Sequence, residues 1–524
     1  MTSKIEKLLN GILQKDHHQF RQNINKQVFL EFTDSLRKKG LSDMERSMER
    51  LSWVLEHEKP VILDDERIVF TRTLTEIPEI FTEDEWVDIK KNHYIHELGK
   101  VCNISSDFGY TLEVGLEKRR NEAEASLIKQ KELGNTKGIK FLNAVIQSVD
   151  DILNLTQRYA LYARKIGRED IFEVLSKVPR YGATSFYEAL QSFRILHFTL
   201  WASGNYHNTI GRFDQYMLKY LQNDLEKGIL DYNSAFELLE EFFLSFNKDS
   251  DLYPGMQQGD NGQSMVLGGI DQEGNDAFNE LSEMCLKASL ELKLIDPKIN
   301  LRVTKNTPLS IYNLGTELTK QGLGFPQYSN DEIVIPGLIS KGYEEKDARD
   351  YVVAACWEFI IPGKGMDIPN IDALSFAKMV NKTAKEHLIN TESFDDFLLN
   401  LREEMKEELS VIQDGKANLY MEPAPFQSVL MDGCIEEARD ISLGSKYNNY
   451  GIHGTGVSTA VDSLASLKKF VFEEGSVGKP DLIYGIENNF ENQEELWSKF
   501  EYDSPKMGND GDYVDSIAVR LLDD

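Results

Sequence analysis

Residues 350–365 read DYVVAACWEFIIPGKG, an apolar run that carries Cys356 and, two positions later, Glu358. The β-branched and aromatic residues predict a buried strand, and the Pro and Gly residues after it end the strand in a loop. Because successive side chains of a strand point to opposite faces, we expect Cys356 and Glu358 on one face and Trp357 on the other. The run therefore predicts a thiol beside a carboxylate, near a loop tip.

Two interpretations of this pair are open. Apolar and acidic neighbours raise a thiol pKa, so Cys356 would be a poor nucleophile but a protonated group able to exchange a hydrogen atom. A carboxylate beside it, its own pKa raised by burial, could serve as general acid or base to a substrate. In the structural alternative, Cys356 packs as a small hydrophobic side chain and Glu358 forms an ion pair.

The chain around this run alternates short apolar segments with amphipathic ones. The predicted strands are SMVLGGI (264–270), INLRVT (299–304) and DEIVIPG (331–337), and the predicted helices are NELSEMCLKASLEL (279–292), LSIYNLGTELTKQG (309–322) and DALSFAKMVNKTAKEHL (372–388). Such alternation is typical of parallel strands joined by crossover helices, which predicts an α/β sheet or barrel.

The first half of the chain has a different pattern. Residues 1–245 contain few Gly or Pro and repeat apolar positions three and four apart, which predicts helices. The most apolar of them, EALQSFRILHFTLWASG at 188–204, should be buried on several sides. We expect one domain over residues 1–524, with 1–245 as a mainly helical outer layer and 246–524 as a strand-rich core that carries the Cys356 loop.

Composition excludes several classes of protein. With 58 Lys+Arg and 87 Asp+Glu residues in 524, the net charge of −29 argues against binding to nucleic acids or anionic membranes. The N-terminal segment lacks the apolar core of a signal peptide, and no run of 18 apolar residues follows, so we expect a cytoplasmic protein that does not span a membrane. The four cysteines form no CxxC pair, so neither a metal site nor disulfides are expected.

Several blocks of the chain, in order, resemble the glycyl radical enzymes, the pyruvate formate-lyase-like superfamily. They are GRFDQYM (211–217), DNGQSMVLGGIDQEGNDAFNEL (260–281), GFPQYSNDEIVIPGLISKGYEEKDARDYVVAACWE (324–358), DGCIEEARD (432–440), KYNNYGIHGTGVSTAVDSLASLKKFVFEE (446–474) and MGNDGDYVDSIA (507–518). The resemblance implies an α/β barrel of ten strands, in two five-stranded parallel halves wrapped by helices, with Cys356 on an inner loop.

The resemblance also implies a chemistry. Cys356 matches the cysteine that becomes a thiyl radical and abstracts hydrogen from the substrate, and Glu358 matches the general base of the eliminating and decarboxylating branches. Pyruvate formate-lyases carry two adjacent cysteines here, whereas this chain has only Cys356, so formate acetyltransferase chemistry is not expected. Phe359 replaces a proline of the dehydratases, while Pro362-Gly363-Lys364 fits their pattern.

Two further residues match the family by position. Asp372 is the best local match to a dehydratase aspartate, two residues late, and His207 falls near a histidine that contacts substrate hydroxyls. We therefore expect both to bind substrate. The alternatives are a helix N-cap for Asp372 and, for His207, a loop histidine bonded to backbone.

The glycines and remaining cysteines have mainly structural interpretations. Gly262, Gly268 and Gly269 lie in no phosphate-binding pattern, so tight strand packing is expected. Gly451, Gly454 and Gly456 could line the site or form an irregular loop. Cys102 and Cys285, in helical patterns, and Cys434 should be packed in the core.

The motif that carries the family's radical, Arg-Val-x-Gly-Tyr, does not occur in these 524 residues. We therefore expect a glycyl radical supplied in trans by a separate glycyl-domain protein, installed there by a radical S-adenosylmethionine activase, and an anaerobic setting. The resemblance also allows a homodimer. The alternatives are an inactive fragment, a non-catalytic homologue that binds a small molecule and, more remotely, a thiol hydrolase.

Overall fold

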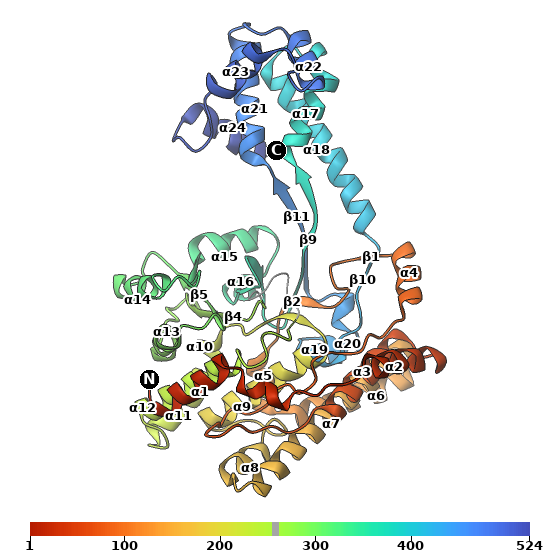
Figure 1. Cartoon of the computed structure of the whole chain (residues 1–524), viewed down its shortest axis with the longest axis vertical. Helices are drawn as coiled ribbons and strands as arrows, with labels where there is room; N and C mark the ends of the chain where they lie inside the picture. The colour runs from red at the N-terminus through yellow and green to blue at the C-terminus, as the bar shows by residue number, and fades with distance from the viewer. Residues whose placement is uncertain (254–260, 524) are drawn as a thin grey trace. The chain divides into compact units, whose positions relative to one another are not determined.

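The computed structural model describes residues 1–253 and 261–523, and the chain folds into two compact units (Figure 1). The first unit consists of Met1–Ile368 and Tyr420–Asn449, and the second of Pro369–Leu419 and Tyr450–Asp524. Each unit is therefore built from two separate segments of sequence. None of the helices in the described ranges is long and apolar enough to cross a bilayer.

The centre of the first unit is a set of parallel strands. They are β2 (Cys102–Ser105), β3 (Tyr206–Thr209), β4 (Ser264–Gly268), β5 (Lys298–Val303) and β6 (Gln327–Asn330). β2 pairs with β3, and β4, β5 and β6 pair in that order, all in parallel. A parallel bridge between Gly211 and Met265 joins the two groups into a row of five. This row is one parallel half of the kind expected for the barrel.

The crossover helices of this half match the sequence pattern. α13 (Glu280–Leu292) connects β4 to β5, and α14 (Leu309–Thr319) connects β5 to β6. The predictions of strands at 264–270 and 299–304 and of these two helices are confirmed. The prediction of a strand at 331–337 is wrong, because Asn330 caps a helix there, its side chain accepting from the N–H of Glu332 at 3.0 Å. That segment is α15 (Asp331–Ser340).

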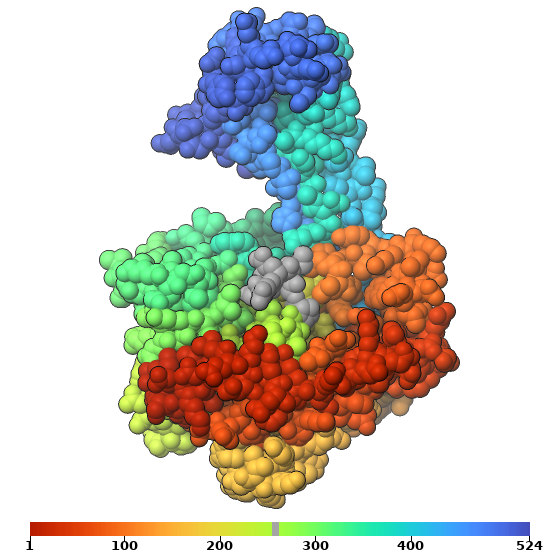
Figure 2. Space-filling view, in the orientation of Figure 1, coloured from red at the N-terminus to blue at the C-terminus, as the bar shows by residue number. Residues whose placement is uncertain are grey.

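Helices dominate the N-terminal half, as predicted. They are α1 (Ser3–Leu13), α2 (Lys26–Lys38), α3 (Asp43–His57), α4 (Glu83–Asn92), α5 (Phe108–Val114), α6 (Leu116–Glu132), α7 (Thr136–Lys165), α8 (Glu169–Leu175), α9 (Phe186–Ala202), α10 (Phe213–Tyr216), α11 (Leu218–Glu226) and α12 (Tyr232–Ser245). Every α9 residue is buried except Tyr187 and Glu188, which confirms the buried helix predicted at 188–204. Figure 2 shows N-terminal segments, in red and orange, across the lower middle and the right of the facing side of the first unit.

Residues 420–449 return to the first unit and complete its interior. Their elements include α19 (Pro425–Val429), α20 (Cys434–Glu437) and part of the short strand β10 (Leu419–Tyr420). The Arg50 guanidinium of α3 donates to Glu422 at 2.7 Å, and both side chains are 2% exposed. Arg119 of α6 donates to the carbonyl of Val429 at 2.9 Å. Two early helices are thus bound to a segment more than 300 residues later.

The second unit is mainly helical. The chain enters it within β9 (Gly365–Ser375) and again within β11 (Tyr447–Thr455), which pair with each other. Its helices are α17 (Phe376–His387), α18 (Phe394–Lys416), α21 (Val457–Leu467), α22 (Lys479–Glu487), α23 (Glu494–Tyr502) and α24 (Asp512–Asp523). Gly451 and Gly454 lie in β11, and Gly456 is the N-cap of α21, so the alternative of an irregular loop at these glycines is wrong.

Candidate active site

Cys356 lies in the tight turn of an antiparallel hairpin. Strand β7 (Val352–Ala354) pairs with β8 (Glu358–Ile360), with Ala354 opposite Glu358, so the turn contains only three residues. The hairpin packs against β2, β3 and β4 of the parallel sheet. The apolar run therefore places its cysteine at the tip of a loop inserted among the central strands, as the sequence predicted.

Two details of that prediction are wrong. The run is not one strand, because Ala355 adopts a left-handed backbone with φ of 45°, which reverses the chain before Cys356. The argument that alternation places Cys356 and Glu358 on one face therefore fails. The expected burial of the thiol fails as well, since Cys356 is exposed and Trp357 is 60% exposed at the tip.

A different interaction brings the pair together. The carboxylate of Glu358 accepts hydrogen bonds from the backbone N–H groups of Cys356 and Trp357, both at 2.9 Å and both to Oε2. No hydrogen bond reaches Oε1 from any residue that the structure describes. Glu358 thus closes the turn with one carboxylate oxygen, Oε2.

A buried polar network fixes the base of the hairpin. Arg302 of β5 donates to the Asp331 carboxylate at 2.8 Å, to the Tyr351 carbonyl at 3.0 Å and to the Arg349 carbonyl at 2.9 Å. The Tyr351 hydroxyl donates to Asp331 at 2.7 Å. A Cβ on Gly269 would lie 2.6 Å from both Arg302 Nε and Asp331 Oδ2, so the tight packing predicted for this glycine is confirmed. The network joins β5 and α15 to the start of β7.

His207 is placed on β3, next to the sheet strand β2. It is 4% exposed, and its Nδ1 lies 2.7 Å from the side-chain oxygen of Asn103, itself 2% exposed. His207 therefore lies on a strand rather than in the loop of the alternative, and its substrate-binding role stays a prediction. Gly262, with φ of +64°, faces the imidazole, and a Cβ there would lie 2.9 Å from three atoms of His207.

Gly262→Ala is expected to disturb His207. Gly322 has φ of +78°, and a Cβ added to it would meet nothing within 4 Å, so Gly322→Ala is the matched control for backbone strain alone. We expect the control to lose about 1 kcal/mol of unfolding free energy and Gly262→Ala about 1–3 kcal/mol more, from overlap with the ring. Urea unfolding measures both. Equal losses would contradict close packing of Gly262 on His207.

Asp372 lies in the part of β9 that belongs to the second unit. Its carboxylate is 3.4 Å from Lys416 Nζ and accepts from the N–H of Ala373 at 2.8 Å. These two donors, the backbone N–H first, lower the pKa of Asp372. The N-cap of α17 is Ser375, which accepts from the Lys378 N–H, so the alternative of Asp372 as a helix cap is wrong. Its substrate-binding role stays a prediction.

Asp367 is a carboxyl group that the sequence analysis missed. It lies on β9 within the first unit and is 7% exposed. Burial, together with the nearby Glu358 carboxylate, raises the pKa of Asp367 to about 7. The segment GKGMDIPNID contains two aspartates, and the family spacing directed attention to the second. Only the path of β9 indicates that the first one lies close to Glu358.

The other cysteines are packed as expected. Cys102, Cys285 and Cys434 are all buried, although Cys102 lies on β2 rather than on the predicted helix. Burial raises the pKa of Cys434 to about 12.

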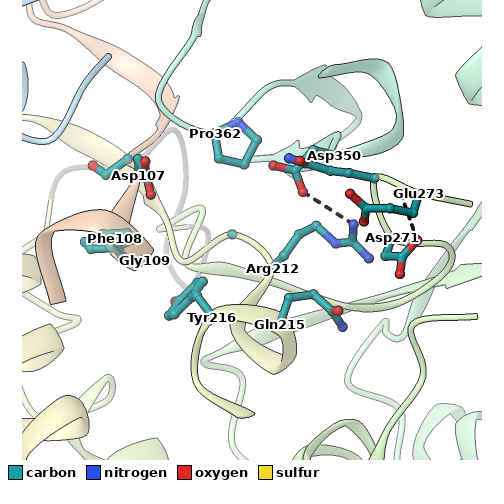
Figure 3. Close-up of a pocket in the computed structure, with 13 residues that line it drawn as sticks. Asp107, Phe108, Gly109, Arg212, Gln215, Tyr216, Asp271, Glu273, Asp350 and Pro362 are labelled. Carbon is teal, nitrogen blue, oxygen red and sulfur yellow. Dashed lines mark hydrogen bonds and ion pairs between the residues drawn. The ribbon is translucent and has the colours of Figure 1, made fainter. Parts of the chain in front are cut away.

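A cavity of about 330 Å³ opens near the carboxyl ends of β2, β3 and β4 (Figure 3). Asp107, Arg212, Asp350 and Pro362 line it, and neither Cys356 nor Glu358 does. The Arg212 guanidinium donates to the Gly268 carbonyl at 2.9 Å and lies 3.4 Å from Asp350. Arg212, from the block GRFDQYM, therefore holds the end of β4 through the Gly268 carbonyl.

Comparison with known proteins agrees with this architecture. A family model described as Pyruvate formate lyase-like matches residues 72–524. Trans-4-hydroxy-L-proline dehydratase of Clostridioides difficile is 28% identical over 427 residues, covering 73% of this chain and 53% of that protein. Isethionate sulfite-lyase of Oleidesulfovibrio alaskensis is 28% identical over 452 residues, covering 78% and 54%. The chain thus spans about half the length of the curated relatives it matches.

The fold is shared with solved structures. The glycerol-bound B12-independent glycerol dehydratase of Clostridium butyricum aligns with a TM-score of 0.80 and 26% identity, covering 100% of this chain and 78% of that one. The predicted barrel fold is thereby confirmed. With its family model covering residues 72–524, the chain belongs to the pyruvate formate lyase-like family.

Proposed function

We propose that this chain is the cysteine-bearing component of a glycyl radical enzyme that eliminates a group from a small substrate or cleaves a bond in it. The observation that carries the proposal is the Cys356 turn, in which Oε2 of Glu358 accepts from the N–H groups of both Cys356 and Trp357 and so holds the carboxylate beside the thiol. The relatives support this class of reaction, since they are named as dehydratases and a sulfite-lyase.

In the proposed mechanism, Cys356 gives up its sulfur-bound hydrogen atom to a glycyl radical and becomes a thiyl radical. The thiyl takes a hydrogen atom from a substrate carbon. Glu358 Oε1 removes a proton from the neighbouring hydroxyl, amine or carboxyl group, and the substrate radical expels its leaving group, to which His207 donates a proton. Cys356 then returns the hydrogen atom to the product radical.

The glycyl radical is proposed to come from a separate glycyl-domain protein, after installation by a radical S-adenosylmethionine activase. The relatives include a protein named as the glycyl radical subunit of 4-hydroxyphenylacetate decarboxylase, from Clostridioides difficile. We place the reaction in an anaerobic cytoplasm, consistent with four cysteines that show no disulfide pattern.

Reconstitution tests this proposal. The chain is mixed without oxygen with an activated glycyl-domain protein, and trans-4-hydroxy-L-proline, isethionate and glycerol are offered as substrates. We expect product from at least one, with the glycyl radical signal in electron paramagnetic resonance decaying faster when the chain and its substrate are both present. A signal unaffected by the chain, with no product from any glycyl-domain protein encoded beside it, would refute supply in trans.

A further inference from the structure

Three metal-ligating side chains meet beside the candidate active site. His96 and Glu97 directly follow the short strand β1 (Tyr94–Ile95), and Cys102 is the first residue of β2. One ligand atom from each of the three lies within 4.8 Å of the other two. His96 is 2% exposed and Cys102 4% exposed. The chain therefore brings a nitrogen, an oxygen and a sulfur donor together in its interior.

The imidazole of His96 is a second, independent indication of a ligand. Neither ring nitrogen has a hydrogen-bond partner among the residues that the structure describes. The nearest charged atom is Glu97 Oε1, 3.6 Å from Nε2, beyond hydrogen-bonding distance. Buried polar groups are normally satisfied, because an unpaired one costs about 1–3 kcal/mol. A group that accepts the imidazole lone pair would remove this cost.

We propose that His96, Glu97 and Cys102 bind a divalent transition metal ion, with Zn²⁺ the ion that suits the donor set best. Zinc binds imidazole, carboxylate and thiolate at about 2.0–2.3 Å, so its ligand atoms lie about 3.3–3.8 Å apart. The 3.6 Å separation of His96 and Glu97 fits this range without rearrangement. A thiolate and a carboxylate together neutralise the charge of the ion. Three protein ligands leave the fourth tetrahedral position for water or another small ligand.

Neighbouring contacts orient the donors. The Tyr206 hydroxyl donates to Glu97 Oε2 at 2.6 Å, which turns Oε1 towards His96. Such second contacts commonly fix ligand orientation in metal sites. Tyr206 is also the register partner of Cys102 in the β2–β3 pair, and the next residue on its strand is His207. The ion would thus tie the segment after β1 to the two strands that carry Asn103 and His207.

Cobalt substitution tests the site without requiring the radical reaction. The purified chain is titrated with Co²⁺ under anaerobic conditions, and thiolate-to-cobalt charge-transfer absorption is followed. We expect one equivalent of Co²⁺, displaced by Zn²⁺, with release of the Cys102 thiol proton. Cys102→Ser should lose the absorption, and Tyr206→Phe should weaken binding by about 10- to 100-fold.

The chain offers matched controls for this titration. Cys285→Ser and Cys356→Ser should retain the absorption, since neither residue belongs to the cluster. His387→Gln tests the more exposed group of Glu386, His387 and Glu404, and should also leave it unchanged. X-ray absorption of the Zn²⁺-loaded wild-type chain gives a result independent of any variant, one sulfur at about 2.3 Å and lighter donors at about 2.0–2.2 Å. No bound metal in the wild type, or absorption that survives Cys102→Ser, would overturn the proposal.

Discussion

Cys356→Ala is expected to abolish turnover of the reconstituted enzyme, a loss of at least about 10⁶-fold, because no other group in the proposed mechanism can exchange a hydrogen atom with substrate carbon. The fold should survive. Cys356 is exposed at a turn, and substitutions at such positions usually change unfolding free energy by no more than about 0.5 kcal/mol. Product formation and urea unfolding, measured on the same preparation, separate the two effects.

Two variants complete this test. Cys434→Ala removes a buried thiol and should show the opposite result, reduced stability with activity retained. Glu358→Gln retains a side-chain oxygen that can accept the two N–H groups of the turn but cannot accept a proton, so we expect turnover to fall by about 10²- to 10⁴-fold. Turnover by Cys356→Ala at a tenth of the wild-type rate would exclude the thiyl mechanism.

Asp331→Ala is expected to destabilise the first unit by about 3–5 kcal/mol, the cost of leaving one partner of a buried ion pair uncompensated. Arg302 and Asp331 are 0% and 2% exposed, and Asp331 also accepts from the Tyr351 hydroxyl and from the Ile270 N–H. The free energy of unfolding from urea titration measures the loss. Because Tyr351 leads directly into β7, turnover should fall as well.

The double variant Arg302→Met/Asp331→Leu provides the control for this effect. Replacing both members of a buried pair with apolar residues is often close to neutral, so the double variant should be more stable than Asp331→Ala. An exposed pair, Lys320 with Glu317, should change stability by no more than about 1 kcal/mol when Glu317 becomes alanine. A loss below about 1 kcal/mol for Asp331→Ala would show that the network does not hold the hairpin.

Periodicity was sufficient to predict the elements whose burial follows from their own sequence. The strands at 264–270 and 299–304 and the helix at 188–204 are apolar on the faces they bury, so local pattern and tertiary packing agree. DEIVIPG is equally apolar, yet the cap from Asn330 makes it a helix. A short apolar run fits either structure, and a single hydrogen bond can decide between them.

The sequence gives candidate site residues but not their geometry. The order of motifs selects Cys356 and Glu358 as candidates, whereas the reversal at Ala355 depends on β7 packing against strands from distant parts of the chain. Asp367 and the group of His96, Glu97 and Cys102 become neighbours of other site residues only once β1, β2 and β9 are placed. The spacing of residues along the sequence does not indicate which of them become neighbours in the fold.

Because residues 420–449 return to the first unit, this unit cannot complete its interior until they have been synthesised. Arg50 emerges early, but its buried partner Glu422 is 372 residues later, an interval of roughly 20–75 s at translation rates of about 5–20 residues per second. During that interval the guanidinium and the surface around α3 lack the segment that covers them. The nascent chain therefore presents an incomplete interior throughout this interval, which gives molecular chaperones time to bind it.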